Sequence, residues 1–154
     1  MASISVEPPS QVQRGMTLYP PLVVSCSNGE YNFFRVILVD SHGEVADQQY
    51  IHGTLSVSPQ TLGPSSNSSR PPKDFAVFHD LVIGRSGTYT LQVNAYQMDY
   101  DSMSMYHAAS ILSREVRVRT SAVSEGRPSN HHPHLASSES RLLVRLSDAG
   151  FPIP

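Results

Sequence analysis

The sequence predicts a mainly β fold, in which a β-sandwich is followed by one late α-helix. In residues 88–96, apolar residues alternate with polar ones, which is the period of a strand that buries one face. Near the C-terminus, Leu142, Leu146 and Ala149 recur at helical spacing. At 154 residues the chain suits one domain with its own core, so we expect a single domain over residues 1–154.

The stretch 74–98 organises the expected sandwich. Two strand-like runs, residues 75–83 and 88–96, flank a short link at residues 84–87. Tyr89 follows Gly87 at the start of the second run. This resembles the corner of immunoglobulin-like sandwiches, where a tyrosine hydroxyl bonds back to an upstream backbone group. The stretch therefore predicts a β-sandwich and leaves the sandwich family open.

The first strands follow from local patterns. Ile4 and Val6 alternate before a Pro-Pro pair, which suits an edge strand because proline cannot donate to a sheet. Residues 22–27 form a β-branched run that ends at an Asn-Gly turn signal. Residues 31–39 are almost continuously apolar, which indicates a central strand covered on both faces, or a local bulge. Residues 51–57 form a further strand.

The last predicted strand covers residues 111–120. It contains E-V-R-V-R, so Val116 and Val118 are expected to face the core while Arg117 and Arg119 face outward. The total is seven or eight strands and one late helix.

Three polar segments are predicted to be mobile surface loops: residues 58–73, 99–108 and 121–136. The helix after them has clear end signals. Ser137 or Ser138 can cap its N-terminus, Glu139 suits the positive end of the helix dipole, and Gly150 is a natural stop.

The charge is nearly balanced but unevenly distributed. Eleven Lys and Arg residues face thirteen Asp and Glu residues, for a net charge of −2, which does not suggest an obligate nucleic-acid binder. The excess of acid lies in residues 1–113, whereas residues 114–154 carry more basic than acidic groups, and all of those basic groups are Arg. Such an end suits a polyanion or an acidic partner, and it also suits a solvated edge.

The single cysteine, Cys26, allows no disulfide within the chain, which fits a reducing compartment. Because it lies in a strand pattern, we expect it to act as a small buried apolar residue. The N-terminus shows no secretion signal and no apolar run approaches 18 residues, so we expect an intracellular protein without a membrane segment.

Several residues invite a chemical reading. His131, His132 and His134 lack Cys or carboxylate partners at zinc spacing, so we expect an exposed loop and no metal. Asp99 and Asp101 are not followed by a calcium loop. His52 and His79 lie in strand patterns and are expected to be structural. Since no nucleophile, phosphate-binding or metalloprotease motif appears, we expect neither catalysis nor a cofactor.

Four segments together resemble the velvet domain of fungal regulators. P-P-L-V-V at residues 20–24 resembles the proline-rich start of an early strand, and H-G-T-L-S-V-S at residues 52–58 resembles a G-T strand. Residues 75–83, followed by G-T-Y-T-L at residues 87–91, resemble the F-x-F-x-D-L and G-x-Y-x-L core of the family. Residues 140–153 resemble its last helix and strand.

This resemblance implies an immunoglobulin-like sandwich related in shape to Rel-homology domains. It implies a nuclear regulator of transcription in fungal development, sporulation and secondary metabolism, which forms homo- or heterodimers with other velvet proteins. It also implies binding of double-stranded DNA. The candidate phosphate contacts are Arg14, Arg117, Arg119 and Arg127.

One departure favours an alternative. Velvet proteins carry a basic loop with R-x-C-G and K-D-R-R elements before the prolines, whereas residues 11–19 contain only Arg14. Each missing cation weakens the release of counterions that drives DNA binding. The alternative is a protein-interaction module of the same fold that does not contact DNA. In that reading the outward arginines serve solubility and protect a sheet edge.

Overall fold

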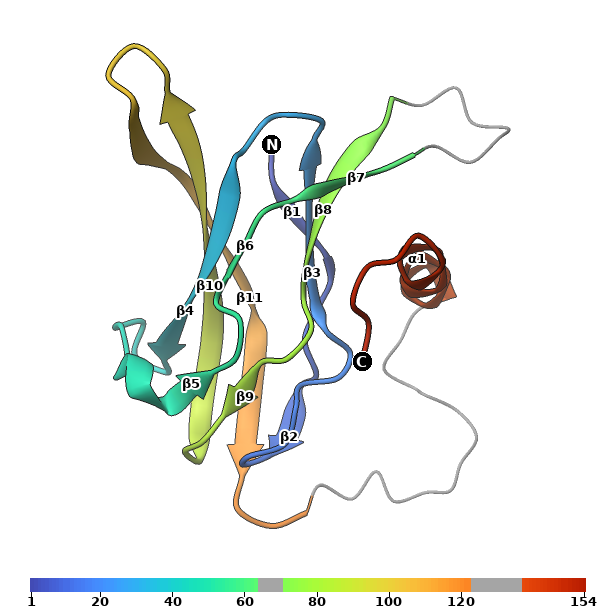
Figure 1. Ribbon diagram of the computed structural model, residues 1–154. Coiled ribbons are helices and arrows are strands. Elements are labelled where there is room, and N and C mark those ends of the chain that lie inside the picture. The colour runs from blue at the N-terminus through green and yellow to red at the C-terminus, as the bar shows by residue number, and fades with distance from the viewer. Residues whose placement is uncertain (64–70, 123–136) are drawn as a thin grey trace.

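The computed structural model describes residues 1–63, 71–122 and 137–154 (Figure 1). Sheet A has the strand order β1 (Ser3–Val6), β3 (Leu22–Ser27), β8 (Lys73–Phe78) and β7 (Gln60–Leu62). Sheet B has the order β2 (Gln11–Gln13), β11 (Ser104–Arg119), β10 (Gly87–Asp99), β4 (Phe33–Asp40) and β6 (Ser56–Val57). A small sheet pairs β5 (Ile51–His52) with β9 (Val82–Ile83) after the 3₁₀ turn η1 (Gln48–Tyr50), and helix α1 (Ser137–Asp148) comes last.

The molecule has three layers (Figure 1). Sheets A and B enclose the main hydrophobic cluster, and α1 packs on the other face of sheet A. Neighbouring residues of sheet A therefore point into different clusters. Val24 and Phe78 join the main cluster, whereas Val23 and Val77 join Leu146 of the helix. The mainly β fold with one late helix is confirmed.

The central strands of sheet B match the prediction only in part. β4 lies between β10 and β6, so its central position is confirmed. Its outward face is covered only in part, however. Phe33 and Ile37 are half-buried, Arg35 is exposed and Val39 is buried, while Phe34 and Leu38 point into the core.

The two runs of the stretch 74–98 lie in different sheets, because β8 pairs in sheet A and β10 in sheet B. At the corner between them, the Tyr89 hydroxyl donates to the backbone oxygen of Ser86 at 3.3 Å, which confirms the expected return to an upstream backbone group. Burial raises the pKa of Tyr89, so the hydroxyl keeps its proton for this bond. Gly87 leaves room for it, since a Cβ there would lie 3.1 Å from the hydroxyl oxygen.

The prediction of one strand over residues 51–57 is wrong. The chain breaks into β5 and β6 at Gly53, which has a φ of +118°. A Cβ on Gly53 would lie 2.4 Å from the backbone oxygen of Asp80. The next residue, Thr54, donates its backbone N–H and its hydroxyl to the Asp80 carboxylate, each at 2.9 Å. The break is therefore fixed by contacts distant in sequence.

The prediction of a loop over residues 99–108 is also wrong. β10 continues to Asp99 and β11 begins at Ser104, so a paired hairpin occupies most of this stretch. We call residues 97–106 the arm, because β4 pairs no further along β10 than Tyr96. The arm projects beyond the rest of sheet B at the upper left of Figure 1. Asp99 closes its turn by accepting the backbone N–H of Asp101 at 3.0 Å.

The other two predicted loops are partly described. Residues 58–73 contain β7 and the first residue of β8, while residues 64–70 and 123–136 lie outside the described ranges. The three histidines at 131, 132 and 134 fall in the second gap.

The helix ends as predicted. Gly150 has a φ of +94°, and the backbone N–H of Phe151 donates to Leu146 at 2.9 Å while that of Gly150 donates to Ser147 at 3.0 Å. These two bonds satisfy carbonyls that the helix leaves free at its C-terminus. No helix within the described ranges is long and apolar enough to cross a lipid bilayer.

Cys26 lies in β3 and is buried in the main cluster, as predicted. Burial raises the pKa of its thiol to about 11, with a further contribution from the nearby carboxylates of Asp74 and Glu30. The thiol is therefore protonated at neutral pH and behaves as a small apolar group.

Candidate nucleic-acid interface

The predicted DNA contacts of the last strand lie where β2 joins sheet B. β2 pairs in parallel with the end of β11, opposite Arg117 and Arg119. Val116 and Val118 are buried and the two arginines are exposed, so the predicted orientation of this strand is confirmed. β11, which lies between β2 and β10, thus presents two guanidinium groups on its outer face.

Arg14 joins the same end of the sheet. It directly follows β2, and its backbone N–H donates to the backbone oxygen of Arg119 at 2.7 Å. The next residue, Gly15, donates to Ile83 at 3.1 Å and so holds the turn against β9. Arg14 and Arg119, which lie more than 100 residues apart in the sequence, are therefore neighbours. We call Arg14, Arg117 and Arg119 the basic end; the fourth candidate, Arg127, lies outside the described residues.

The basic end keeps its charge available. Among the residues that the structure describes, no carboxylate lies within ion-pair distance of these three side chains. Arg119 donates to the side-chain oxygen of Gln11, at 3.1 Å. A guanidinium group held by a neutral amide still has free N–H groups for a phosphate or a carboxylate.

Two further arginines have structural partners. Arg114 donates its side-chain N–H to the backbone oxygen of Pro8 at 2.8 Å, and its backbone N–H donates to Glu7 at 2.9 Å. Arg85 donates to the Tyr50 hydroxyl at 2.9 Å and lies 4.9 Å above the ring of the same tyrosine. Sequence spacing gives no signal for either contact.

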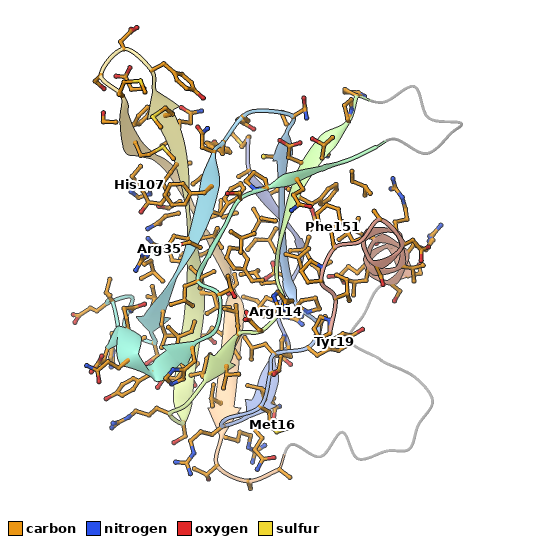
Figure 2. The ribbon with its side chains drawn as sticks, viewed as in Figure 1. Met16, Tyr19, Arg35, His107, Arg114 and Phe151 are labelled. Carbon is orange, nitrogen blue, oxygen red and sulfur yellow. The ribbon has the colours of Figure 1, made fainter. Side chains whose placement is uncertain are left out.

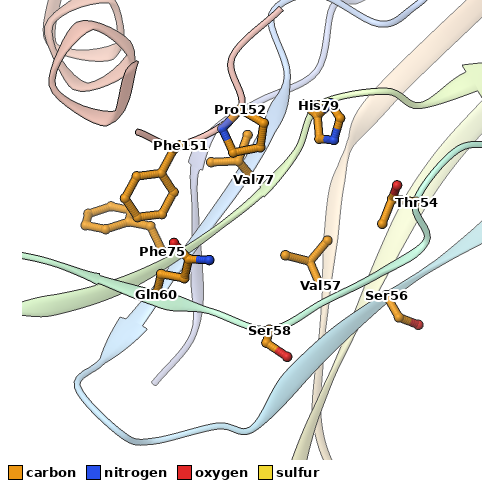
Figure 3. A pocket seen from close by; sticks show the side chains of 10 residues that line it. All are labelled: Thr54, Ser56, Val57, Ser58, Gln60, Phe75, Val77, His79, Phe151 and Pro152. Atoms are coloured by element: carbon orange, nitrogen blue, oxygen red, sulfur yellow. The ribbon is translucent and has the colours of Figure 1, made fainter. Parts of the chain in front are cut away.

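The structure also has a groove between the edges of the two sheets (Figure 3). Its volume is about 280 Å³, and its lining includes Phe75, Val77 and Phe151 beside the half-buried His79. Thr54 also lines it but donates its hydroxyl to Asp80. Within the described ranges, no hydrogen bond joins His79 to a hydroxyl of the groove.

The outer face of sheet B is the feature that sequence reasoning missed. Phe33 stacks on Tyr96 with ring centroids 4.5 Å apart, and Tyr96 lies 5.5 Å from His107. Leu112 is 61% exposed on the same sheet, and the arm adds four exposed large side chains: Tyr100, Met103, Met105 and Tyr106. Figure 2 shows His107 and Arg35 on the side of sheet B that faces away from sheet A. The sequence did carry one signal of this face: apolar residues lie within the predicted loop 99–108, where a surface loop would expose them.

Comparison of the chain with models of known protein families gives no match, and comparison with curated protein sequences gives none either.

Proposed function

We propose that the chain is a divergent velvet-type regulator that acts in the nucleus through dimerisation and through contact with DNA. In this proposal the facing sheets form an immunoglobulin-like, Rel-homology-like sandwich. Two features support it. The Tyr89 hydroxyl makes the expected corner bond, and two segments that carry the resemblance touch each other where Thr54 donates to Asp80. The processes regulated would be fungal development and secondary metabolism.

The observation that carries the DNA contact is the basic end. Arg14, Arg117 and Arg119 come together from distant parts of the chain, are exposed, and face no described carboxylate at ion-pair distance. Guanidinium groups bind phosphate oxygens through paired N–H donors. Three such groups neutralise few phosphates, so binding by one copy alone is expected to be weak and to depend on salt.

A salt-titrated gel shift with duplex DNA tests this proposal. Retardation by the chain should weaken with salt, and Arg14→Gln, Arg117→Gln and Arg119→Gln should each reduce the slope of log affinity against log salt by about 0.9. Arg141→Gln, which removes an exposed charge from helix α1, is the matched control and should leave the slope unchanged. Absence of retardation at low salt, with and without a co-expressed velvet partner, refutes the DNA contact.

The second candidate function is a protein-interaction module of the same fold that binds no DNA. The exposed apolar side chains of the arm favour it, together with the net charge of −2. Retardation only in the presence of the partner would make the chain an accessory subunit. Partner binding without any retardation would establish the pure interaction module.

A further inference from the structure

The turn between β3 and β4 contains the only Asn-Gly pair of the sequence, Asn28 and Gly29. It lies at the top of Figure 1, where the chain passes from sheet A to sheet B. Both residues are exposed, and the backbone N–H of Glu30 closes the turn by donating to Ser27 at 3.0 Å. An asparagine deamidates most readily before a glycine, because glycine has no Cβ to hinder attack by its own nitrogen.

Deamidation is a reaction within this pair of residues. The backbone nitrogen of Gly29 attacks Cγ of Asn28, a new C–N bond forms, and the bond from Cγ to the side-chain nitrogen breaks. Ammonia leaves and takes the proton of the backbone amide. Water then opens the cyclic imide, at Cγ to give aspartate or at the backbone carbonyl to give isoaspartate. The reaction needs water and no other reactant.

One buried carboxylate, that of Asp74, restrains both reacting groups. Its Oδ1 accepts from the side-chain nitrogen of Asn28 at 2.8 Å, and its Oδ2 accepts from the backbone N–H of Gly29 at 2.8 Å. The hydroxyl of Thr61 accepts from the same Asn28 nitrogen at 2.9 Å and donates to Asp74 at 2.7 Å. A backbone N–H that donates to an anion loses its proton less easily, and the bound amide is not free to turn toward Gly29.

We propose that Asn28 is a deamidation site, which Asp74 protects in the folded chain and which reacts when strand β7 leaves the edge of sheet A. β7 has three residues, supplies Thr61, and pairs with β8 alone among the described strands. Such a short edge strand opens more often than the centre of a sheet. Its departure removes the Thr61 hydroxyl and admits water to Asp74, so that Asn28 and Gly29 are released together. The site goes beyond the proposed function and does not depend on it.

The product of the reaction repels the group that delayed it. A carboxylate in place of the Asn28 amide would lie against Oδ1 of Asp74, where the amide nitrogen now lies at 2.8 Å. Two carboxylates at this separation disfavour each other's ionised form. β7 is then held less tightly, and its Leu62 belongs to the cluster that packs helix α1 on sheet A. Because ammonia is lost, deamidation loosens this edge of the sheet irreversibly.

Peptide mapping by mass spectrometry, after incubation of the full chain at neutral pH, measures the rate at Asn28. We expect the folded wild-type chain to react at least about tenfold more slowly than the chain unfolded in guanidinium chloride. Asp74→Ala removes both acceptors and should raise the folded rate by about tenfold or more. Thr61→Val keeps the shape of an exposed side chain and removes its hydroxyl, so it should raise the rate by about fivefold.

Val93→Ala is the matched control, because it destabilises the centre of sheet B and leaves the turn unchanged. The folded control should deamidate at the wild-type rate. Equal rates in the folded and unfolded wild-type chain overturn the proposal, and so does a folded rate that neither Asp74→Ala nor Thr61→Val raises. An equal acceleration by Val93→Ala and Asp74→Ala also overturns it, since the reaction would then follow global unfolding and not the release of β7.

Asn28→Asp tests the consequence directly, since it introduces the aspartate product. Amide hydrogen exchange in β7 should become faster by about tenfold, and the additional change Asp74→Asn should reverse part of this effect because an amide again faces a carboxylate. Unchanged exchange in Asn28→Asp overturns the loosening of the sheet edge. None of these measurements involves DNA, so their failure is distinct from failure of the DNA contact.

Discussion

Asp74 is a buried carboxylate that holds together the edge of sheet A. It accepts hydrogen bonds from the side chain of Asn28 at 2.8 Å, from the backbone N–H of Gly29 at 2.8 Å and from the hydroxyl of Thr61 at 2.7 Å. Burial by itself would raise the pKa of Asp74, but these hydrogen bonds outweigh it and hold the pKa below its usual range. The turn after β3 and strand β7 are thus tied to β8 through one ionised group.

The sign of the pH effect follows from that lowered pKa. The stabilisation by Asp74 is fully present above the carboxyl pKa of the unfolded chain, about 3.9, and it is lost as the pH falls through the lower pKa of the folded chain. Urea unfolding at several pH values below about 5 should show this loss, and Asp74→Asn should reduce the slope of stability against pH. Equal slopes in both proteins would contradict the role of Asp74.

At Gly53, a contact with a residue distant in sequence leaves no room for a side chain. Gly53→Ala should lower the free energy of unfolding by about 2–4 kcal/mol, because the new Cβ meets the backbone oxygen of Asp80 in addition to the strain of a positive φ. Gly29→Ala is the control, since Gly29 also has a positive φ but nothing lies within 4 Å of its Cβ position. Chemical denaturation should give a clearly larger loss for Gly53→Ala; similar losses would mean that the backbone shifts easily.

At the scale of elements, helix α1 covers the second face of sheet A. Leu146 is fully buried against this sheet, whereas Val144 on the same helix is 60% exposed. Leu146→Ala should lower the free energy of unfolding by about 3 kcal/mol, and Val144→Ala should change it by about 0.5 kcal/mol or less. Urea denaturation compares the two. A small loss for Leu146→Ala would show that the helix packs loosely on the sheet.

Elements with one buried face were predictable from the sequence. The alternation in residues 88–96 placed Tyr89, Leu91 and Val93 in the core, and the helical spacing placed Leu146 there. The arm was not predictable, because both of its faces carry exposed side chains and no alternation results. Its strands are held by their register with each other and by the turn at Asp99.

The candidate site was predictable only residue by residue. Alternation with Val116 and Val118 gave the outward direction of Arg117 and Arg119. Their proximity to Arg14 depends on the parallel pairing of β2 with β11, which joins segments more than 100 residues apart. No local pattern encodes such a pairing, since the short β2 has a single buried residue, Val12.

At the scale of the whole molecule, stability should fall along sheet B from its centre toward the arm. Around Val93, β10 has neighbours on both sides and its inner face is buried, whereas the arm has only its own two strands. Amide hydrogen exchange at low protein concentration should therefore be faster between residues 97 and 106 than around Val93, by several orders of magnitude. Equal protection in both regions would contradict this gradient.

Cys26 is a natural probe of transient opening of the folded chain. It is the only thiol in the sequence, it is 2% exposed, and burial raises its pKa to about 11. A disulfide reagent can react with the buried sulfur only after the structure around β3 has opened, and the reactive form is the thiolate. The labelling rate of the native protein therefore measures how often this part of the structure opens, without an introduced probe. Variants that keep Asp74 can be ranked by this one rate, because Asp74 itself contributes to the raised pKa of the thiol.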